Sequence, residues 1–313
     1  MKLVIQIPCY NEADTLPGTL ADLPRDVPGF ESVEWLIIND GSTDDTVQVA
    51  RRNSFDHIVE LSNNQGLAAA IVMGIEASLR AEAGVIVNTD VDNQYSDACI
   101  ARLTEPILDQ RAQIMICARL ISMIEHFSPI KRRLQAFGSW IVRKASNKDM
   151  EDAPSGFRAF HRDTALRLYV FNRYTYTLET IIQAGRLGIP IVSVPVEVNG
   201  PKRESRLIKS VAQHIWRFTS TILRIAVLYS PLRFFTALAA ITMLPTLWAF
   251  VRFLYLYAIG EGYGHIQSLV ICTSLIAMGA LTLMVGILAD LVAASRSISA
   301  DIRAQLLRAE LAR

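Results

Sequence analysis

Two aspartates stand two residues apart where an apolar run of the chain ends. Asp90 and Asp92 follow Val85–Val87, whose residue types predict a fully buried strand. In an extended chain, side chains two residues apart point to the same side, so both carboxylates can face one point. Unpaired, they would repel each other, and a divalent cation shared with a diphosphate would remove that repulsion. The spacing therefore indicates a metal-bound diphosphate, with an ordinary polar turn as the alternative.

Three further polar segments accompany the aspartates. They contain Pro8, Tyr10, Asn11 and Glu12, then Asp40, Gly41 and Ser42, and lastly Asn64 and Gly66. The first two follow expected strands, and the third precedes an expected helix whose N-terminus can receive an anion. In a parallel sheet all of them would share the edge at which α/β proteins bind nucleotides, although each alone also fits simple turn chemistry. The chain has no G-x-G-x-x-G and no G-x-x-x-x-G-K-[ST], which argues against a dinucleotide dehydrogenase and a P-loop NTPase.

The elements that must position these residues alternate between strand and helix patterns. Apolar runs occur at Leu3–Ile7, Trp35–Ile38, His57–Leu61, Val85–Val87, Ile114–Cys117 and Ile189–Val198. Helical patterns occur at Thr43–Arg52, Gly66–Arg80 and Ile130–Ser146. Ser42 or Thr43 can cap the first helix, with Asp44 and Asp45 in its first turn. The alternation predicts an α/β fold with a mostly parallel sheet and helices on both faces.

The hydrophobic content of 51% is concentrated near the C-terminus. Phe234–Val251 carries no charge, the apolar stretch continues to Ile259, and Ile266–Ala289 is free of charged residues. Each stretch approaches the ~20 residues that cross a bilayer as a helix. Two such stretches in tandem predict a transmembrane hairpin, whose first helix Pro245 would kink, and a pair of buried core helices is the alternative.

Basic residues on both sides of these stretches predict the orientation. Lys202, Arg203, Arg206, Lys209, Arg217, Arg224 and Arg233 precede them, and Arg296, Arg303, Arg308 and Arg313 follow. The link Gly260–His265 has only Glu261, so we expect both termini in the cytoplasm and the link outside. No signal peptide is expected, because Met1 leads directly into a strand. The four cysteines lack pair spacing, which fits reduced thiols and argues against zinc.

Taken in order, the polar motifs resemble those of family 2 glycosyltransferases with the GT-A fold. The resemblance rests on Pro8-Cys9-Tyr10-Asn11-Glu12, Asn39-Asp40-Gly41-Ser42-Thr43-Asp44, Asn64-Gln65-Gly66 and Asp90-Val91-Asp92-Asn93-Gln94. Ser155-Gly156-Phe157-Arg158 and Arg203-Glu204-Ser205-Arg206, followed by two membrane helices, narrow it to dolichol-phosphate mannose synthases and bacterial polyprenyl-phosphate glycosyltransferases. The resemblance covers nearly the whole chain, and the ordered set is far more specific than any single motif.

The resemblance implies a role for each matching position. Pro8 to Glu12 and Asp40 would contact the nucleoside, and Asp90, Asp92 and Gln94 would hold Mg²⁺ or Mn²⁺ against the diphosphate. Arg119 and Arg133 would bind the lipid phosphate, and Arg203 and Arg206 would close over the diphosphate from a mobile loop. Two departures are Ser96 in place of the usual proline and Cys117-Ala118-Arg119 in place of Gly-Ser-Arg; the second leaves the placement of Arg119 open. The Gln-x-x-Arg-Trp motif of processive synthases is absent, so we expect one sugar per acceptor.

The basic segment from Arg119 to Lys148 supports a phosphate acceptor independently, because Glu125 is its only acid. Arginine binds phosphate through two parallel hydrogen bonds, so Arg119 with Arg132 or Arg133 is the expected clamp. A basic helix face attracted to anionic lipids is the alternative. A phosphate monoester is largely a dianion at pH 7 and already a nucleophile, so no general base is obligatory. One displacement would invert the anomeric centre.

Three other residues have two interpretations each. Glu179 can bind a sugar hydroxyl or stabilise a helix N-terminus. The segment beginning at Ser155 can form the acceptor-side wall of the site, and its Arg158 can equally be a structural ion-pair partner. The amphipathic, basic stretch Leu207–Tyr229 predicts a helix in the membrane interface, or one packed on the globular domain.

These observations predict four segments: a cytoplasmic GT-A catalytic domain over 1–206, juxtamembrane helices over 207–231, two transmembrane helices within 232–294 (about 232–259 and 265–291), and a cytoplasmic tail over 295–313. The expected partners are a nucleotide sugar, a polyprenyl phosphate and the inner membrane, with no nucleic acid; a homo-oligomer is left open. The expected function is inverting, metal-dependent transfer of one hexose to a polyprenyl phosphate. The alternatives are a transferase using a lipid hydroxyl, as in diacylglycerol or ceramide, and a non-catalytic sugar-nucleotide binder.

Overall fold

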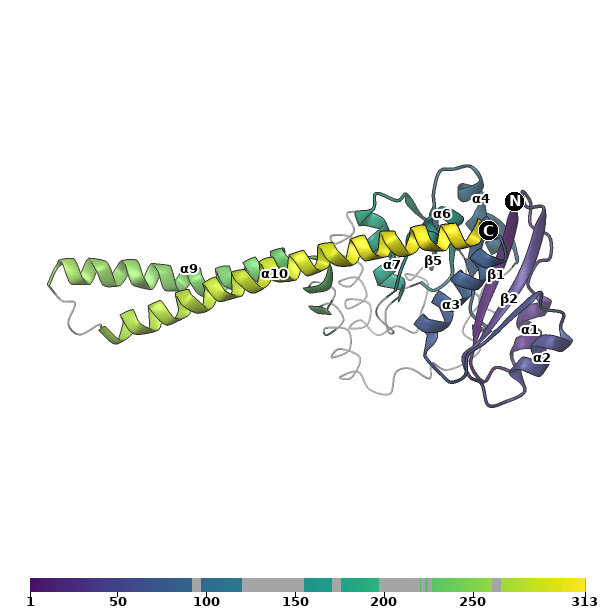
Figure 1. Ribbon diagram of the computed structural model, residues 1–313, viewed down its shortest axis with the longest axis horizontal. Coiled ribbons are helices and arrows are strands. Elements are labelled where there is room, and N and C mark those ends of the chain that lie inside the picture. Colours follow the sequence, from purple (N-terminus) through teal and green to yellow (C-terminus); the bar gives the residue numbers. More distant parts are fainter. Residues whose placement is uncertain are drawn as a thin grey trace. The chain divides into compact units, whose positions relative to one another are not determined.

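The computed structural model describes residues 1–91, 97–119, 155–170, 176–196, 220, 223–224, 227–260 and 266–312. Two compact units make up the chain (Figure 1). The first comprises Met1–Val211 together with Ala300–Arg313, and the second comprises Ala212–Ser299. The expected helix Ile130–Ser146, and all of Leu207–Tyr229 except 220, 223–224 and 227–229, lie outside the described residues.

A mostly parallel sheet forms the centre of the first unit, as the sequence predicts. Its strands are β1 (Lys2–Cys9), β2 (Ser32–Asn39), β3 (His57–Glu60), β4 (Val85–Asn88), β5 (Ile114–Arg119), β6 (Arg158–His161) and β7 (Ile191–Val196). Across the described residues the spatial order is β3-β2-β1-β4-β6-β5-β7. Strands β1 and β4 are almost continuously apolar because helices cover both faces of a parallel sheet and exclude water from each.

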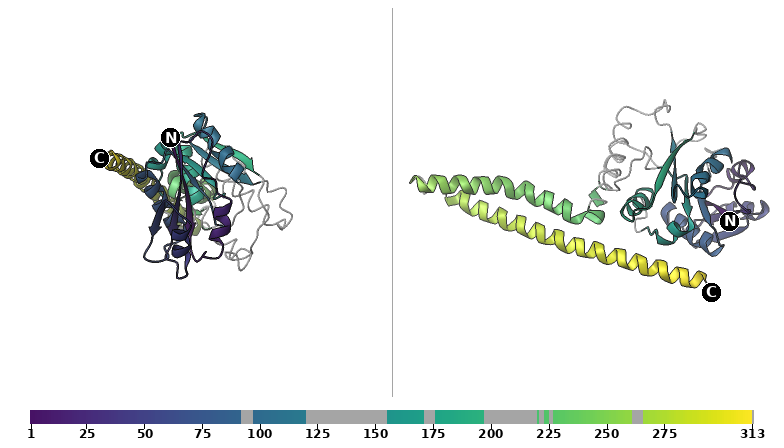
Figure 2. Two further views of the ribbon diagram at one scale, coloured as in Figure 1. Left: turned by 90° about the vertical axis from the view of Figure 1, so that its right-hand side faces the viewer. Right: turned by 90° about the horizontal axis from the view of Figure 1, so that it is seen from above.

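Helices lie on both sides of the sheet (Figures 1 and 2), and its central strands are buried. One face carries α1 (Leu16–Ala21), α2 (Thr46–Arg52) and α4 (Asp97–Leu108). The other carries α3 (Leu67–Arg80), which approaches so closely that a Cβ on Gly74 would lie 2.6 Å from Gln6 Oε1. Two shorter helices, α6 (Arg162–Arg167) and α7 (Tyr176–Arg186), follow β6.

Strand β6 is the antiparallel member of the sheet, and the sequence analysis missed it. It pairs with β4 so that Asn88 faces Arg158, and it pairs with β5 so that Ile116 also faces Arg158. The first residues of β6 therefore lie at the edge where β4 and β5 end. This arrangement brings a segment from late in the chain beside the residues that follow β4.

The start of α2 differs from the expectation. The helix begins at Thr46 with Asp45 as its N-cap, and no side-chain hydrogen bond caps it. The Ser42 hydroxyl accepts a hydrogen bond from the Asn11 N–H, and the Thr43 N–H donates to the Asn11 side chain. Because these groups join two loops, they are not available to start a helix at Thr43.

The second unit contains two helices long and apolar enough to cross a membrane. They are α9 (Pro231–Ala258) and α10 (Ile266–Leu311), and Gly279 and Gly286 of α10 permit their close approach. A Cβ on Gly279 would lie 2.2 Å from Met243 Cγ, and one on Gly286 would lie 2.7 Å from Phe235 Cβ. The contact positions rise along one helix as they fall along the other, so the pair is an antiparallel hairpin with small residues at its contact.

Helix α10 continues through the predicted tail without a break. Its last part, from Ala300 onward, belongs to the first unit. There Arg303 pairs with Glu76 at 3.8 Å and Glu310 pairs with Arg80 at 3.3 Å, both partners lying on α3. Ala304 is buried on the same part of the helix. The sequence between Gly286 and Leu311 contains no Gly or Pro, so nothing in it ends the helix.

Candidate active site

Two loops at the carboxyl ends of β1 and β2 are joined by hydrogen bonds between side chains and backbone. Asn11 N–H donates to Ser42 Oγ at 2.9 Å, and Thr43 N–H donates to Asn11 Oδ1 at 2.8 Å. Glu12 N–H donates to Thr46 Oγ1 at 2.9 Å. Asn11 sits at a positive φ of 54°, which asparagine tolerates better than most residues. The structure thus brings together three predicted site residues, Asn11, Glu12 and Ser42.

Asp40 is buried at the end of β2 and ties a third loop to this edge. Its two carboxylate oxygens accept hydrogen bonds from Gln65 N–H at 2.7 Å and Gly66 N–H at 2.9 Å. Gly66 is the N-cap of α3, so the anion at that helix N-terminus is the protein's own carboxylate. A carboxylate has further lone pairs, so the same side chain can also accept from a ligand.

Gly41 allows the second and third loops to approach each other. It has a positive φ of 69°, and a Cβ there would lie 2.5 Å from the Asn63 carbonyl carbon and 2.7 Å from Asn64 N. Any larger residue would have to separate the two backbones. Pro8 is the next-to-last residue of β1 and pairs with Ile38 of β2. Tyr10, just beyond the strand, is 43% exposed at the same edge.

Asp90 follows β4 at the centre of this edge and is half-buried. Asn88, two residues earlier, donates from Nδ2 to the Gly156 carbonyl at 2.9 Å and accepts from Gln6 Nε2 at 3.2 Å. A Cβ on Gly156 would lie 3.1 Å from Asp90 Oδ2. The loop that precedes β6 is therefore held against the aspartate by buried polar side chains.

The described side chains at this edge include the carboxylates of Glu12, Asp40, Asp44 and Asp90. Burial, followed by the charges of Glu12, Asp44 and Asp90, raises the pKa of the Cys9 thiol far above its usual value. Carboxylate oxygens are the ligands that Mg²⁺ and Mn²⁺ prefer, so both the donor type and the negative potential fit such a cation. Within the described residues no three Asp, Glu, His or Cys side chains form a complete metal site, and the other two predicted ligands, Asp92 and Gln94, lie outside that part.

Three predicted residues surround the start of β6 and α7. Ser155 is fully buried, and its hydroxyl has no hydrogen-bond partner among the residues that the structure describes. Arg158 is fully buried and donates to the Ser155 carbonyl, the Thr177 carbonyl and Thr180 Oγ1 at 2.7 to 2.9 Å. These bonds hold the guanidinium against the start of α7. The two interpretations of Arg158, as part of the acceptor-side wall and as an ion-pair partner, both stay predictions. Glu179 lies buried in the first turn of α7, and its two interpretations both stay predictions.

The remaining predicted residues cannot be placed as side chains. Arg119 ends β5, and only its backbone is described. Those outside the described residues are Asp92, Gln94, Arg132, Arg133, Arg203 and Arg206. Conversely, sequence reasoning missed Gln6, Asn88 and Tyr176. Gln6 had a detectable signal, since a polar residue inside the apolar run Leu3–Ile7 has to find a buried partner.

Comparison with protein families identifies the chain. The model of "Glycosyl transferase family 2" matches residues 4–169, which extend from within β1 to beyond the end of β6. The chain belongs to glycosyltransferase family 2. This family 2 transferase therefore has the fold and enzyme class that its ordered motifs indicated.

Named relatives of this transferase act on lipid phosphates. An undecaprenyl-phosphate mannosyltransferase of Micrococcus luteus is 27% identical over 206 residues, covering 63% of this chain and 83% of the relative. A polyprenol monophosphomannose synthase of Mycolicibacterium smegmatis is 23% identical, covering 62% of this chain and 76% of the relative. A dolichyl-phosphate beta-glucosyltransferase of Dictyostelium discoideum is 26% identical, covering 64% and 68%.

Solved structures confirm the GT-A fold. A glucosyl-3-phosphoglycerate synthase from Mycobacterium tuberculosis, crystallised with Mn²⁺, UDP and glucosyl-3-phosphoglycerate, superposes with a TM-score of 0.54. The identity is 16%, and the match covers 71% of this chain and 77% of that one. At this identity the likeness concerns the fold alone.

Proposed function

We propose that this family 2 transferase moves one hexose from a nucleotide sugar, of the GDP-mannose or UDP-glucose type, to a polyprenyl or dolichyl phosphate at the cytoplasmic membrane face. The observation that carries the proposal is the meeting of Asp40, the loops of Asn11 and Ser42, and Asp90 at one edge of the sheet. The names of the relatives support the class of acceptor. The two apolar helices support a site at a membrane.

The donor nucleoside is assigned to the loops that follow β1 and β2. Tyr10 offers an exposed ring there, and Asp40 offers acceptor lone pairs fixed by two backbone N–H groups. A base that presents an N–H, as uracil and guanine both do, suits such an acceptor. Because the loops are joined to one another, this half of the site is formed before the donor arrives.

The diphosphate is assigned to the cation site after β4. Asp90, with Asp92 and Gln94, would hold Mg²⁺ or Mn²⁺, and the bound cation would stabilise the negative charge on the departing nucleoside diphosphate. Asp90 is well suited to this role because its neighbours at the carboxyl ends of β1 and β2 add further negative potential. Arg203 and Arg206 are proposed to add positive charge on the other side of the diphosphate.

The lipid phosphate is the proposed nucleophile. One of its oxygens forms a bond to the anomeric carbon while the bond from that carbon to the diphosphate oxygen breaks, so the centre inverts and the nucleoside diphosphate leaves with the bonding electrons. No proton has to be removed from a dianionic phosphate. Arg119, Arg132 and Arg133 are proposed to align it. The Ser155 hydroxyl, which is buried and has no partner within the described part of the chain, and Glu179 are proposed to contact the substrates beside the loop before β6.

The test is transfer by the full chain in nanodiscs. Purified protein is incubated with a polyprenyl phosphate, Mn²⁺ and each of a panel of labelled GDP- and UDP-hexoses. We expect organic-extractable label that disappears with chelator and is released by mild acid, because a glycosyl phosphodiester of a prenol is acid-labile. Absence of such label with every donor would overturn the proposal.

Two other results would identify the alternatives. An acid-stable glycolipid formed with diacylglycerol or ceramide would assign the enzyme to lipid hydroxyl acceptors. Binding of a nucleotide sugar without turnover on any acceptor would assign the chain to a non-catalytic binder. Each outcome contradicts the phosphate acceptor in a different way, so the same reaction mixtures distinguish all three.

A further inference from the structure

We infer that Gly156 and Tyr176 are positioning residues that fix the carboxylate of Asp90. The inference rests on the proposed function only for the role of Asp90 as a cation ligand. Its structural basis is a seat for this carboxylate, formed by the loop before β6 and the first turn of α7. Neither residue was connected with Asp90 by the motifs, since both lie far from it in the sequence.

Gly156 forms one side of this seat. A Cβ at this position would lie 3.1 Å from Asp90 Oδ2 and 3.8 Å from Oδ1. The first distance is tighter than nearly all real Cβ contacts, so an added methyl group would displace the carboxylate by a few tenths of an ångström. Gly156 does not have a positive φ, so alanine would be penalised there by space and not by backbone strain.

Tyr176 approaches the same glycine. The hydroxyl of this buried tyrosine would lie 3.2 Å from the Cβ on Gly156, the position that Asp90 Oδ2 also approaches. The phenol and the carboxylate therefore converge on one side of the glycine. Glycine at position 156 leaves room for both polar groups where any side chain would separate them.

Two sets of buried hydrogen bonds hold the seat in place. The Gly156 carbonyl accepts from Asn88, which is in turn held by Gln6 of β1. Arg158 donates to the Thr177 carbonyl and to Thr180 Oγ1, and Thr180 donates to the Tyr176 carbonyl. These bonds fix the first turn of α7 against the start of β6. Buried networks of this kind restrict neighbouring side chains more strongly than surface contacts do.

A functional consequence follows for cation affinity. A ligand whose orientation is fixed beforehand loses less freedom on binding a metal, and groups that orient ligands typically change metal affinity about 10- to 100-fold. Loose packing without such a role would leave affinity unchanged when the seat is altered. Cation affinity therefore separates positioning from ordinary packing.

The experiment compares Gly156→Ala with Gly18→Ala in the full chain. Gly18 lies in the same unit, and a Cβ there would meet nothing within 4 Å, so it is a matched control. Free Mn²⁺ is measured by electron paramagnetic resonance during titration in the presence of UDP and, separately, of GDP. We expect Gly156→Ala to raise the Kd for Mn²⁺ about 10- to 100-fold relative to Gly18→Ala, and excess Mn²⁺ to restore turnover.

Tyr176→Phe provides a second variant that keeps the ring and so the packing of α7. We expect it to raise the Kd in the same direction by several-fold, with an unchanged melting temperature. Equal Mn²⁺ affinity in Gly156→Ala and Gly18→Ala, or in Tyr176→Phe and wild type, would overturn the inference and leave the proposed function standing. If wild type binds no Mn²⁺ with either nucleotide, the proposed cation site fails, and the inference fails with it.

Discussion

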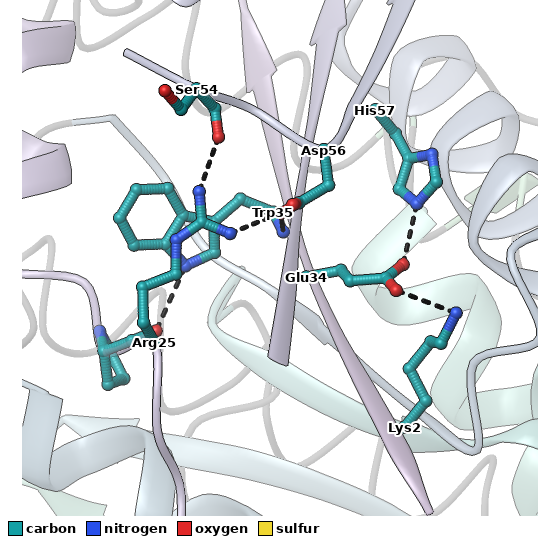
Figure 3. A network of polar contacts seen from close by, with 8 residues as sticks. Lys2, Arg25, Glu34, Trp35, Ser54, Asp56 and His57 are labelled. Atoms are coloured by element: carbon teal, nitrogen blue, oxygen red, sulfur yellow. Dashed lines mark hydrogen bonds and ion pairs between the residues drawn. The ribbon is translucent and has the colours of Figure 1, made fainter. Parts of the chain in front are cut away.

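Glu34 and Asp56, near the amino edge of the parallel sheet, have different partners from Asp40 and Asp44 at its carboxyl edge. Glu60, which ends β3, does not follow this division, because it pairs with the exposed Arg51 at 2.8 Å. At the amino edge, the carboxylate of Glu34 contacts the ammonium group of Lys2 at 2.8 Å and the imidazole of His57 at 2.7 Å (Figure 3). At the carboxyl edge, Asp40 accepts hydrogen bonds from two backbone N–H groups. Asp44 accepts hydrogen bonds from two backbone N–H groups and from the Thr46 hydroxyl. For these aspartates no ion pair occurs among the described residues.

A second cluster at the amino edge repeats the pattern. The guanidinium of Arg25 lies 3.6 Å from the centroid of the Trp35 ring, pairs with Asp56 and donates to the Ser54 carbonyl at 2.6 Å (Figure 3). Asp56 also accepts from Trp35 N–H at 2.7 Å. Glu34 and Asp56 thus each have a cationic side chain within contact distance.

The difference shows how the fold can keep uncompensated negative charge near a substrate site. Cationic partners cancel a carboxylate, whereas N–H and hydroxyl donors stabilise it and leave the net negative charge of the region in place. At the amino edge the contacts of Glu34 with Lys2 and His57 link the first residues of β1, β2 and β3. At the carboxyl edge Asp40 and Asp44 keep their negative charge, which favours a divalent cation.

The largest expected effect comes from removing charge at the carboxyl edge. Asp90→Asn keeps the size of the side chain but weakens a cation ligand, so we expect sugar transfer to fall at least about 100-fold, because Lewis-acid stabilisation amounts to several kcal/mol. The labelled-sugar assay measures this loss. Asp109→Asn, on an exposed aspartate paired with Arg111, is the matched control and should keep full activity. Equal activity in the two variants would contradict the comparison.

A smaller effect is expected where the carboxylate has a structural use. Asp40→Asn replaces one acceptor oxygen with an amide NH₂ that faces a backbone N–H, a loss of about 1.5–3 kcal/mol for a hydrogen bond to a charged group. We expect faster hydrogen exchange at Gln65 and Gly66 together with weaker nucleotide binding. Unchanged protection of these amides would mean that the two hydrogen bonds do not hold the loop.

Raising the salt concentration should affect hydrogen exchange at the two edges differently. Ion pairs between exposed charges contribute about 0.2–1 kcal/mol and are screened within about 10 Å at 0.1 M salt. Raising the salt concentration should therefore increase hydrogen exchange around Trp35 and His57 while leaving Gln65 and Gly66 unchanged. The same response at both edges would show that their partners do not differ in the way described.

The smallest expected effect is on the pH dependence of stability in acid. Burial raises the pKa of Glu34, but hydrogen bonds from Lys2 and His57 outweigh burial and lower it below the ordinary value of 4.5. A lowered folded-state pKa contributes stability above the unfolded-state pKa, and this stability is lost as the pH falls from about 4.5 through the folded-state value. Glu34→Gln should flatten that decline in the amide protection of β2 between pH 6 and 3. An equally steep decline in the variant would exclude Glu34 as its source.

Much of the fold could be predicted from the sequence because its strands are apolar on both faces. Strands β1, β2 and β4 coincide with apolar runs to within a few residues. Strand β6 is as short as β3 and β4, but it was missed because Arg158 and His161 at its ends do not have a strand-like polarity pattern. Helix α1 contains Pro17 and Gly18, which weaken any helix signal in the sequence.

The candidate site could be predicted as a set of positions but not as a set of contacts. Parallel strand ends share an edge, so the clustering of the loops of Asn11 and Ser42 followed from the alternation of elements. The use of Asp40 by the backbone of Gln65 and Gly66 depends on the approach of two loops, and no local pattern encodes that approach. The convergence of Tyr176 with Asp90 depends on the reversal of chain direction at β6, which the sequence analysis did not find.

That reversal has a consequence for how such enzymes diversify. The chain leaves the sheet at Arg119, the last residue of β5, and re-enters it at Arg158, the first residue of β6, on one and the same rim. A graft between these two points would leave the register of both strands intact. Because Arg132 and Arg133 are proposed to bind the acceptor, we expect a chimera that exchanges 120–154 to change its lipid preference while retaining its original donor. Such a result would show that donor and acceptor specificity can be exchanged separately.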